Sequence, residues 1–210
     1  GAALPGVSPL RVVFSGGGTG GHLYPALALA TALQARQPGV ELLFVGAERG
    51  IEARVLPARG LPHLLLPVEG FRRGAGAQGV VENLGVLAAL FRSLAALAGH
   101  LRALRPSAVV VTGGYAGGPA GLLAALMGIP LVVQEQNAIP GLTVRLLSLR
   151  ARQIHLAFPE ARESLPRPAR VRARVSGNPV RPPEAVDREG AARHFQVALE
   201  RELVLVVGGS

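Results

Sequence analysis

Two glycine-rich segments carry the residues best suited to binding an anionic substrate. The first reads SGGGTGGH at 15–22 and the second reads TGGYAGGP at 112–119; each lies between a short apolar run and an Ala- and Leu-rich stretch. Glycines let backbone N–H groups approach an anion, and a helix that starts there directs the positive end of its dipole to the same place. Phosphate or diphosphate is the expected ligand, with a tight turn that needs small residues as the structural alternative.

Three side chains in or near these segments could take part in catalysis. His22 could accept a proton from a substrate hydroxyl or could cap the loop, and Tyr115 could donate a hydrogen bond to the ligand or pack against its own helix. Glu135 belongs to the polar run QEQN at 134–137, which ends an apolar segment. Its carboxylate could orient His22 or act as a base, whereas capping of the following helix is the structural alternative.

Short apolar runs alternate with helical patterns along most of the chain. Because parallel strands need helical crossovers and are buried on both faces, this alternation predicts a doubly wound, Rossmann-like α/β fold with a parallel sheet. Ligands of such sheets bind beyond the carboxyl ends of the strands, so both glycine segments are expected at one edge. The pattern predicts strands at 11–14, 41–45, 63–66, 108–112, 131–134, 153–157 and 171–175, and helices at 23–36, 51–59, 80–104, 119–127 and 142–150.

The charge balance favours an anionic partner. The 210 residues contain 22 Lys and Arg, all of them arginine, against 13 Asp and Glu, which gives a net charge of +9. Nucleic acid, a lipid surface and a phosphorylated substrate all fit this charge, but aromatic residues make up only 4% of the chain, too few for base-stacking surfaces. No nucleic acid partner is therefore expected. The absence of Cys excludes thiolate metal sites and cysteine nucleophiles, and the absence of Lys excludes a Walker A phosphate loop.

Gly and Pro become frequent at 176–183, which indicates a linker. We therefore expect one Rossmann-like domain at 1–175. Residues 176–210 are expected to hold the linker, a helix at 188–198 and an apolar strand at 203–207 that ends in glycines, as the first strand of a second Rossmann-like domain. Since no helix follows that strand, the sequence predicts a truncated chain.

A basic loop with Phe71, Arg72 and Arg73 precedes the long apolar helix predicted at 80–104. Apolar residues flanked by arginines could dock on an anionic bilayer, whereas a helix of the core is the structural alternative. The start of the chain lacks the pattern of an export signal, so a cytoplasmic location is expected.

Two other functions fit part of the pattern. Gly16, Gly18 and Gly21 match the G-x-G-x-x-G fingerprint of nicotinamide dinucleotide domains. Such domains carry an acidic residue at the tip of the second strand, but here Val45 is followed by Gly46, so a nicotinamide-dependent oxidoreductase is disfavoured. The other alternative is a non-catalytic module that binds a prenyl diphosphate lipid.

Four strings in order along the chain resemble the MurG family of glycosyltransferases: FSGGGTGGHLYPALALA at 14–30, TGGYAGGPAGLLAALMGIPLVVQEQNAIPG at 112–141, GNPVR at 177–181 and LVVGGS at 205–210. The resemblance implies the GT-B fold, with 1–175 as the acceptor-side domain and 176–210 leading into a donor-side domain. It also implies inverting transfer of N-acetylglucosamine from UDP-N-acetylglucosamine to lipid I, which is undecaprenyl-diphosphate N-acetylmuramoyl-pentapeptide, to give lipid II in peptidoglycan synthesis. No metal or cofactor is implied.

The same resemblance implies roles for individual residues. His22, Tyr115 and Glu135 would line the catalytic cleft, with His22 as the favoured base. It further implies a peripheral protein at the cytoplasmic face of the bacterial inner membrane, and an inactive chain where the donor-side domain is lacking. The residues implied to contact the sugar nucleotide are Thr19, Gly20, Gly21, Asn137, Arg181 and Ser210.

Overall fold

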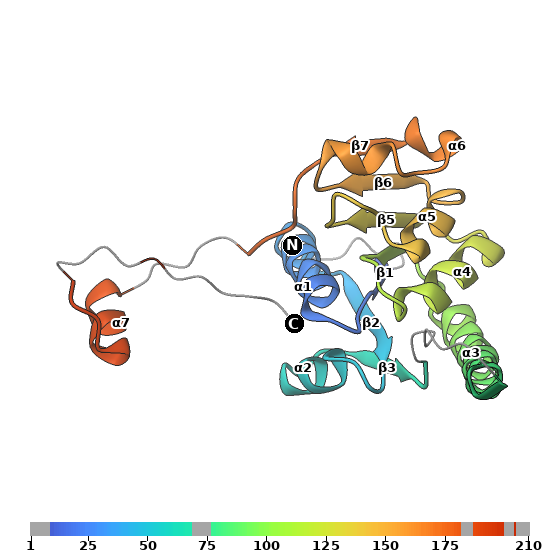
Figure 1. Ribbon diagram of the computed structural model, residues 1–210, viewed down its shortest axis with the longest axis horizontal. Helices are drawn as coiled ribbons and strands as arrows, with labels where there is room; N and C mark the ends of the chain where they lie inside the picture. Colours follow the sequence, from blue (N-terminus) through green and yellow to red (C-terminus); the bar gives the residue numbers. More distant parts are fainter. Residues whose placement is uncertain (1–8, 69–76, 182–186, 200–203, 205–210) are drawn as a thin grey trace. The chain divides into compact units, whose positions relative to one another are not determined.

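The computed structural model describes residues 9–68, 77–181, 187–199 and 204, with no side-chain description for 77–90. The chain divides into two compact units, residues 1–180 and residues 181–210. The first unit contains the sheet and the helices that cover it (Figure 1).

A parallel sheet forms the centre of the first unit. Its strand order is β3-β2-β1-β4-β5-β6-β7, so the direction of strand addition reverses between β1 and β4. The carboxyl ends of neighbouring strands diverge at such a reversal and leave a crevice for ligands. The described strands are β1 (Arg11–Ser15), β2 (Glu41–Ala47), β3 (His63–Leu66), β4 (Ala108–Val111), β5 (Leu131–Glu135), β6 (Gln153–Leu156) and β7 (Ala173–Val175).

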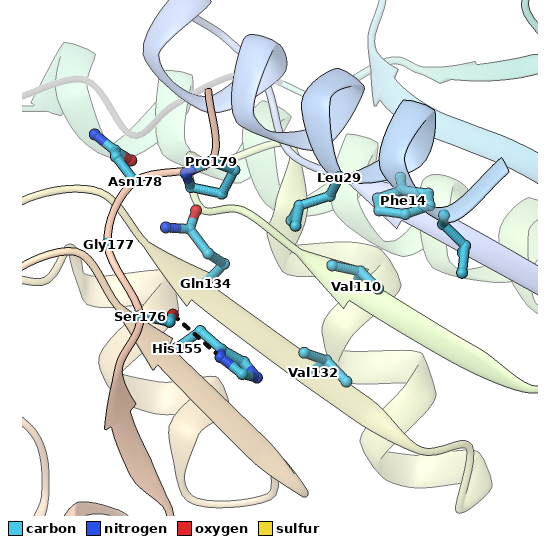
Figure 2. Close-up of a pocket in the computed structure, with 11 residues that line it drawn as sticks. Phe14, Leu29, Val110, Val132, Gln134, His155, Ser176, Gly177, Asn178 and Pro179 are labelled. Carbon is cyan, nitrogen blue, oxygen red and sulfur yellow. Dashed lines mark hydrogen bonds between the residues drawn. The ribbon is translucent and has the colours of Figure 1, made fainter. Parts of the chain in front are cut away.

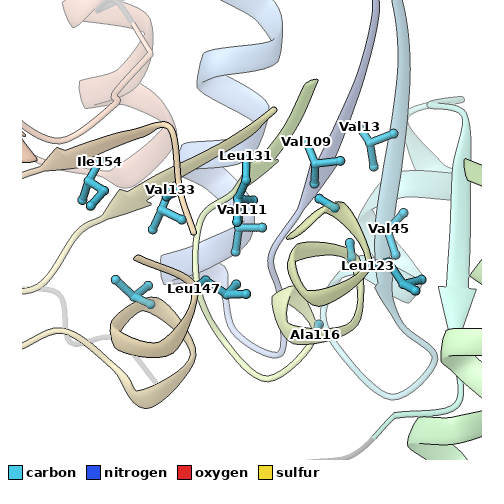
Figure 3. Packing of buried hydrophobic residues seen from close by; sticks show 14 of the residues in the cluster. Val13, Val45, Val109, Val111, Ala116, Leu123, Leu131, Val133, Leu147 and Ile154 are labelled. Carbon is cyan, nitrogen blue, oxygen red and sulfur yellow. The ribbon is translucent and has the colours of Figure 1, made fainter. Parts of the chain in front are cut away.

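Helices cover both faces of this sheet, because successive strand residues point to opposite sides and both sides are apolar. On one face, Phe14 of β1 packs with Leu23 and Leu27 of α1 (Gly20–Arg36) and with Leu56 of α2 (Glu52–Ala58). On the other face, Val13 belongs to a larger cluster under α3, α4 and α5 (Figure 3). These helices are α3 (Ala77–Leu104), α4 (Gly117–Met127) and α5 (Leu142–Ser148). The doubly wound α/β fold predicted from the sequence is confirmed.

Helices α1 and α4 begin earlier than predicted, at Gly20 instead of residue 23 and at Gly117 instead of residue 119. Glycine is unfavourable inside a helix, but it is tolerated in the first turn, where the N–H groups need no partner within the helix. The sequence pattern therefore did not reveal these two helix starts. Thr19 is therefore the N-cap of α1, and Gly20 and Gly21 lie in its first turn.

The part after β6 also differs from the prediction. A 3₁₀ turn, η1 (Pro159–Arg162), and the short α6 (Arg167–Arg170) precede β7, which spans only Ala173–Val175 instead of 171–175. Pro166 and Pro168 favour these short elements because proline fits the start of a helix but not a central strand.

In the second unit, the described helix α7 (Arg188–Phe195) begins at Asp187, whose side chain accepts a hydrogen bond from Gly190 N at 2.9 Å. It ends before residue 198 because Gln196 adopts a left-handed conformation. The strand predicted at 203–207 lies outside the described residues, so the assignment of 176–210 to a second Rossmann-like domain stays a prediction. Among the described residues, no helix combines the length and the apolar character needed to cross a bilayer.

Candidate functional site

The two glycine segments, which we call the first loop (15–22) and the second loop (112–119), meet at the carboxyl ends of β1 and β4. Thr112 N donates to Ser15 O at 3.0 Å, which extends the pairing of the two strands into the loops. A Cβ atom on Gly114 would lie only 2.1 Å from Gly17 O, so the loops are in direct contact. This close approach requires glycine, and it brings the two predicted binding segments to one edge of the sheet.

Tyr115 lies across this junction. Gly18 has a φ of +89°, and a Cβ atom there would approach Tyr115 Cε1 to 2.5 Å, so the ring lies against the first loop. The residue is 36% exposed. Tyr115 thus joins the two loops while part of its surface faces solvent.

His22 lies in the first turn of α1 against the second loop. Its Nδ1 is 3.0 Å from both Thr112 O and Gln136 Oε1, and Thr112 Oγ1 donates to His22 O at 2.7 Å. A Cβ atom on Gly113 or Gly114 would lie about 3.0 Å from ring atoms of His22. The first loop, the second loop and the QEQN run therefore all meet at this histidine.

One sequence hypothesis, that the carboxylate of Glu135 orients His22, is wrong. Its side chain is buried, Oε1 accepts from Asn137 N at 2.9 Å and from Asn137 Nδ2 at 2.8 Å, and Oε2 accepts from Gly141 N at 3.1 Å. Since Gly141 is the N-cap of α5, the carboxylate organises the loop before this helix, close to the capping alternative. The contact with His22 belongs to Gln136, and Glu135 instead fixes the exposed Asn137.

Glu52, in the first turn of α2, was missed by the sequence analysis. It is fully buried, its Oε1 accepts from Ala47 N at 2.8 Å, and Gly18 N lies 3.1 and 3.0 Å from its two carboxylate oxygens. Both described hydrogen-bond partners of its carboxylate are backbone N–H groups. A Cβ atom would lie 2.2–2.3 Å from the Glu52 side chain at three positions, Gly17, Gly46 and Gly50.

This carboxylate corrects one expectation about the first loop. The N–H group of Gly18, expected to bind phosphate, instead donates to an anion that the protein itself supplies. The N–H groups of the first turn of α1 at Gly20 and Gly21 remain next to the exposed Thr19, whose side chain makes no capping hydrogen bond. The N–H group of Gly18 is therefore not free to bind a phosphate.

The other candidate residues lie elsewhere. Arg181 begins the second unit. Ser210 and the expected membrane residues Phe71, Arg72 and Arg73 lie outside the described residues. In the described part of the chain, no three His, Asp or Glu side chains gather as metal ligands.

A separate pocket of about 420 Å³ lies on the face of the sheet that α1 partly covers (Figure 2). Burial, and secondly the positive charge of Arg174, lower the pKa of His155 in this pocket below its ordinary value. Neither His22 nor Tyr115 lines it. The lining residues are mostly apolar and include Phe14, Leu29, Leu33, Val110 and Val132.

The fold and the meeting point of the loops define a Rossmann-like α/β domain with its binding edge at the reversal of strand order. Residues 12–156 match the description "Glycosyltransferase family 28 N-terminal domain". The chain belongs to this family.

Curated relatives agree with this assignment. The chain is 45% identical over 203 residues to the UDP-N-acetylglucosamine--N-acetylmuramyl-(pentapeptide) pyrophosphoryl-undecaprenol N-acetylglucosamine transferase of Moorella thermoacetica, a match that covers 96% of this chain and 53% of the relative. The protein of the same name from Chlorobium phaeobacteroides is 45% identical over 201 residues, 96% of this chain and 55% of the relative. The chain thus spans about half the length of the curated relatives it matches.

Solved structures show the same fold. MurG of Acinetobacter baumannii matches with a TM-score of 0.62 and 32% identity, over 86% of this chain and 48% of that structure. The UDP-GlcNAc 2-epimerase of Methanocaldococcus jannaschii matches with a TM-score of 0.53 and 14% identity, over 81% and 46%, a likeness of fold alone. The resemblance to the MurG family and the GT-B N-terminal fold are confirmed.

Proposed function

We propose that this chain is the acceptor-side half of an N-acetylglucosaminyltransferase that moves N-acetylglucosamine from UDP-N-acetylglucosamine to lipid I and forms lipid II in peptidoglycan synthesis. Relatives 45% identical over nearly the whole chain carry the name of this transferase. The observation that carries the proposal is the position of His22, which contacts the second loop and Gln136 from the first turn of α1.

In the proposed reaction, His22 Nε2 accepts the proton of the C4 hydroxyl of the N-acetylmuramic acid unit. The hydroxyl oxygen forms a bond to the anomeric carbon, and the bond from this carbon to the UDP oxygen breaks, with its electron pair leaving on UDP. One displacement of this kind inverts the anomeric configuration. The acid–base contribution of a positioned histidine is typically about 10²- to 10⁴-fold in rate.

The diphosphate groups would be bound by fixed dipoles and arginines, without a metal. Among the described residues, the start of α1 at Thr19, Gly20 and Gly21 offers backbone N–H groups and the positive end of the helix dipole. Glu135 holds the exposed Asn137 beside this edge, and Tyr115 covers the first loop. Arg181 and Ser210 would complete the sugar-nucleotide contacts together with a donor-side domain that follows residue 176.

Contact with an anionic membrane surface at the cytoplasmic face is part of the proposal. An apolar stripe on and before α5, which we name the α5 patch, is exposed and consists of Ile139, Leu142, Leu146 and Leu149. Arg145 and Arg150 are exposed beside it. Apolar residues flanked by arginines suit insertion into an anionic bilayer interface, and Phe71, Arg72 and Arg73 would extend this contact.

The membrane contact is testable with Leu142→Ser combined with Leu146→Ser. The double variant should sediment less with vesicles that contain anionic lipid than the unchanged chain does, because it removes two of the four apolar residues of the α5 patch. The matched control is Val171→Ser with Val175→Ser, two exposed apolar residues outside the α5 patch. Equal sedimentation of both double variants would contradict the assignment of the α5 patch.

The transfer reaction requires a donor-side half. We would join residues 1–210 to the part of the Moorella thermoacetica relative beyond its matched region, and we call this protein the assembled transferase. With UDP-N-acetylglucosamine and a soluble lipid I analogue, it should form the lipid II analogue at an unchanged rate in the presence of EDTA, while residues 1–210 alone should form none. A rate that depends on added metal would contradict the metal-independent mechanism, and full activity of the 210-residue chain would contradict the division into halves.

A further inference from the structure

The side-chain amide of Gln136 has one orientation that satisfies its surroundings. Its Nε2 lies 2.9 Å from Thr112 O and 3.3 Å from Gln134 O, and it also contacts Gln134 Oε1. All three neighbours are carbonyl oxygens, which only accept hydrogen bonds, so the amide NH₂ must lie on this side. Gln134 is itself oriented, because its Nε2 donates to Glu135 O at 3.2 Å. The carbonyl oxygen of Gln136 therefore faces His22.

This orientation determines which nitrogen of His22 carries the proton. Nδ1 lies 3.0 Å from two acceptors, Gln136 Oε1 and Thr112 O, and neither of these oxygens has a proton to donate. A neutral imidazole has one N–H donor and one acceptor nitrogen. The proton must lie on Nδ1, which leaves the lone pair of the neutral ring on Nε2.

We propose that Gln136 is a positioning residue that keeps His22 in the Nδ1–H tautomer, so that Nε2 is the nitrogen that accepts the proton of the acceptor hydroxyl. When Nε2 has taken that proton, the ring carries a positive charge, and Nδ1–H still donates to the two oxygens that face it. The role of Nε2 in transfer rests on the function proposed above, whereas the tautomer does not.

Hydrogen bonds and close packing hold His22 beside these oxygens. Thr112 contacts His22 at two points, because its backbone O faces Nδ1 and its Oγ1 donates to His22 O. Gly113 and Gly114, with φ of +98° and +72°, lie against the ring, because a Cβ atom on either would approach a ring atom to about 3.0 Å, and both Thr112 and Gln136 are buried. A histidine held in this way has one tautomer that satisfies its contacts and one that places a lone pair against two oxygens.

The tautomer can be measured directly in the 210-residue chain. With ¹⁵N-labelled histidine at a pH where the ring is neutral, long-range ¹H–¹⁵N spectra distinguish a protonated ring nitrogen from an unprotonated one, and His22→Gln identifies the signals of His22. We expect Nδ1 protonated and Nε2 unprotonated. In Gln136→Leu, the population ratio of the two tautomers should shift toward Nε2–H by roughly 2- to 12-fold, the equilibrium equivalent of one neutral hydrogen bond.

Two variants complete the design. Gln136→Asn keeps an amide but is one methylene shorter, so it should shift the ratio in the same direction even if Gln136→Leu fails to fold. Gln153→Leu changes an exposed glutamine next to His155 and should leave the His22 signals unchanged. A wild-type His22 protonated mainly on Nε2, or an unchanged ratio in the folded Gln136 variants, would overturn the proposal.

A second readout separates this inference from the proposed function. In the assembled transferase, Gln136→Leu should lower kcat by roughly 2- to 12-fold, as much as the tautomer ratio shifts, with little change in KM for UDP-N-acetylglucosamine, because a histidine in the wrong tautomer no longer offers its lone pair to the hydroxyl. An unchanged kcat would refute the role of Gln136 in transfer. If the wild-type assembled transferase forms no product while the spectra show the Nδ1–H tautomer, the proposed function fails and the positioning of His22 stands.

Discussion

Removal of the buried carboxylate of Glu52 tests whether the first loop is held by an internal anion. In Glu52→Ala, the N–H groups of Gly18 and Ala47 lose their acceptor, and Ala47 is completely buried. An unsatisfied buried donor costs about 1–3 kcal/mol, so two of them should lower the free energy of unfolding by about 2–4 kcal/mol after the relief of removing a buried charge. In a chain of this size that corresponds to a Tm lower by about 4–16 °C.

The assay is thermal unfolding followed by far-ultraviolet circular dichroism, since the chain contains no Trp for fluorescence. Glu52→Gln keeps the shape and one acceptor oxygen but turns an NH₂ group toward the N–H donors, so its loss should be smaller than that of Glu52→Ala. The matched control is Glu41→Ala, which removes a half-exposed carboxylate whose partner is Arg11 at 2.6 Å. Exposed pairs contribute about 0.2–1 kcal/mol. A Glu52→Ala chain that melts within the range of the control would refute the reasoning.

Four further substitutions test other parts of the account. Glu135→Ala should lower both Tm and the turnover of the assembled transferase, because three hydrogen bonds from the loop before α5 lose their acceptor; an unchanged Tm would contradict the organising role of this carboxylate. Gly18→Ala should destabilise the chain, since it places a Cβ at positive φ against Tyr115. The control Gly118→Ala lies in the first turn of α4, where a Cβ meets no neighbour, and should be neutral or stabilising by less than about 1 kcal/mol. Equal melting of the two variants would argue against the contact between the loops. Because the pKa of His155 is lowered in the folded chain, the unfolded chain binds a proton on this ring at a higher pH than the folded chain does, so the stability contributed by the neutral ring is complete above pH 6.5 and is lost as the pH falls from 6.5 toward the folded pKa. Urea unfolding of His155→Gln should therefore show a smaller loss of stability in acid than the unchanged chain shows. An unchanged loss of stability would contradict the lowered pKa of His155.

Much of the fold follows from the sequence because buried parallel strands leave a strong pattern. Short apolar runs between helices predict every described strand, and the rule that parallel strands end at one edge predicts that 15–22 and 112–119 lie together. Helix starts leave a weaker pattern in the sequence. Glycines that read as loop residues belong to the first turns of α1 and α4, where the tertiary arrangement outweighs a weak local preference.

Of the hypotheses for Glu135, the one that placed it against His22 is wrong, because Gln136 makes that contact. Successive residues at the end of a strand point to opposite sides, so Gln134 and Gln136 share one side and Glu135 faces the other. Because α1 covers the side of Gln134, the amide of Gln136 and not the carboxylate of Glu135 meets His22. Applied to this run, the alternation of side chains along a strand distinguishes Gln136 from Glu135 as the neighbour of His22.

Glu52 could not be assigned a partner from local pattern, since it contacts a loop 34 residues away along the chain. The sequence shows no acidic residue directly after Val45 at the tip of the second strand, whereas the Glu52 carboxylate from the following helix lies beside Ala47 at this tip. Gly46 and Gly50 before it were the available signal, because glycines mark positions where another group approaches the backbone closely.

The central claim, that the junction of the two glycine loops performs sugar transfer through His22, is tested most directly by one comparison. The assembled transferase and its His22→Ala variant are each incubated with UDP-N-acetylglucosamine and a soluble lipid I analogue, and the lipid II analogue is quantified by mass spectrometry. We predict product formation by the first and a rate lower by about 10²- to 10⁴-fold in the second, with a similar Tm for both. Equal rates in the two proteins would contradict the account.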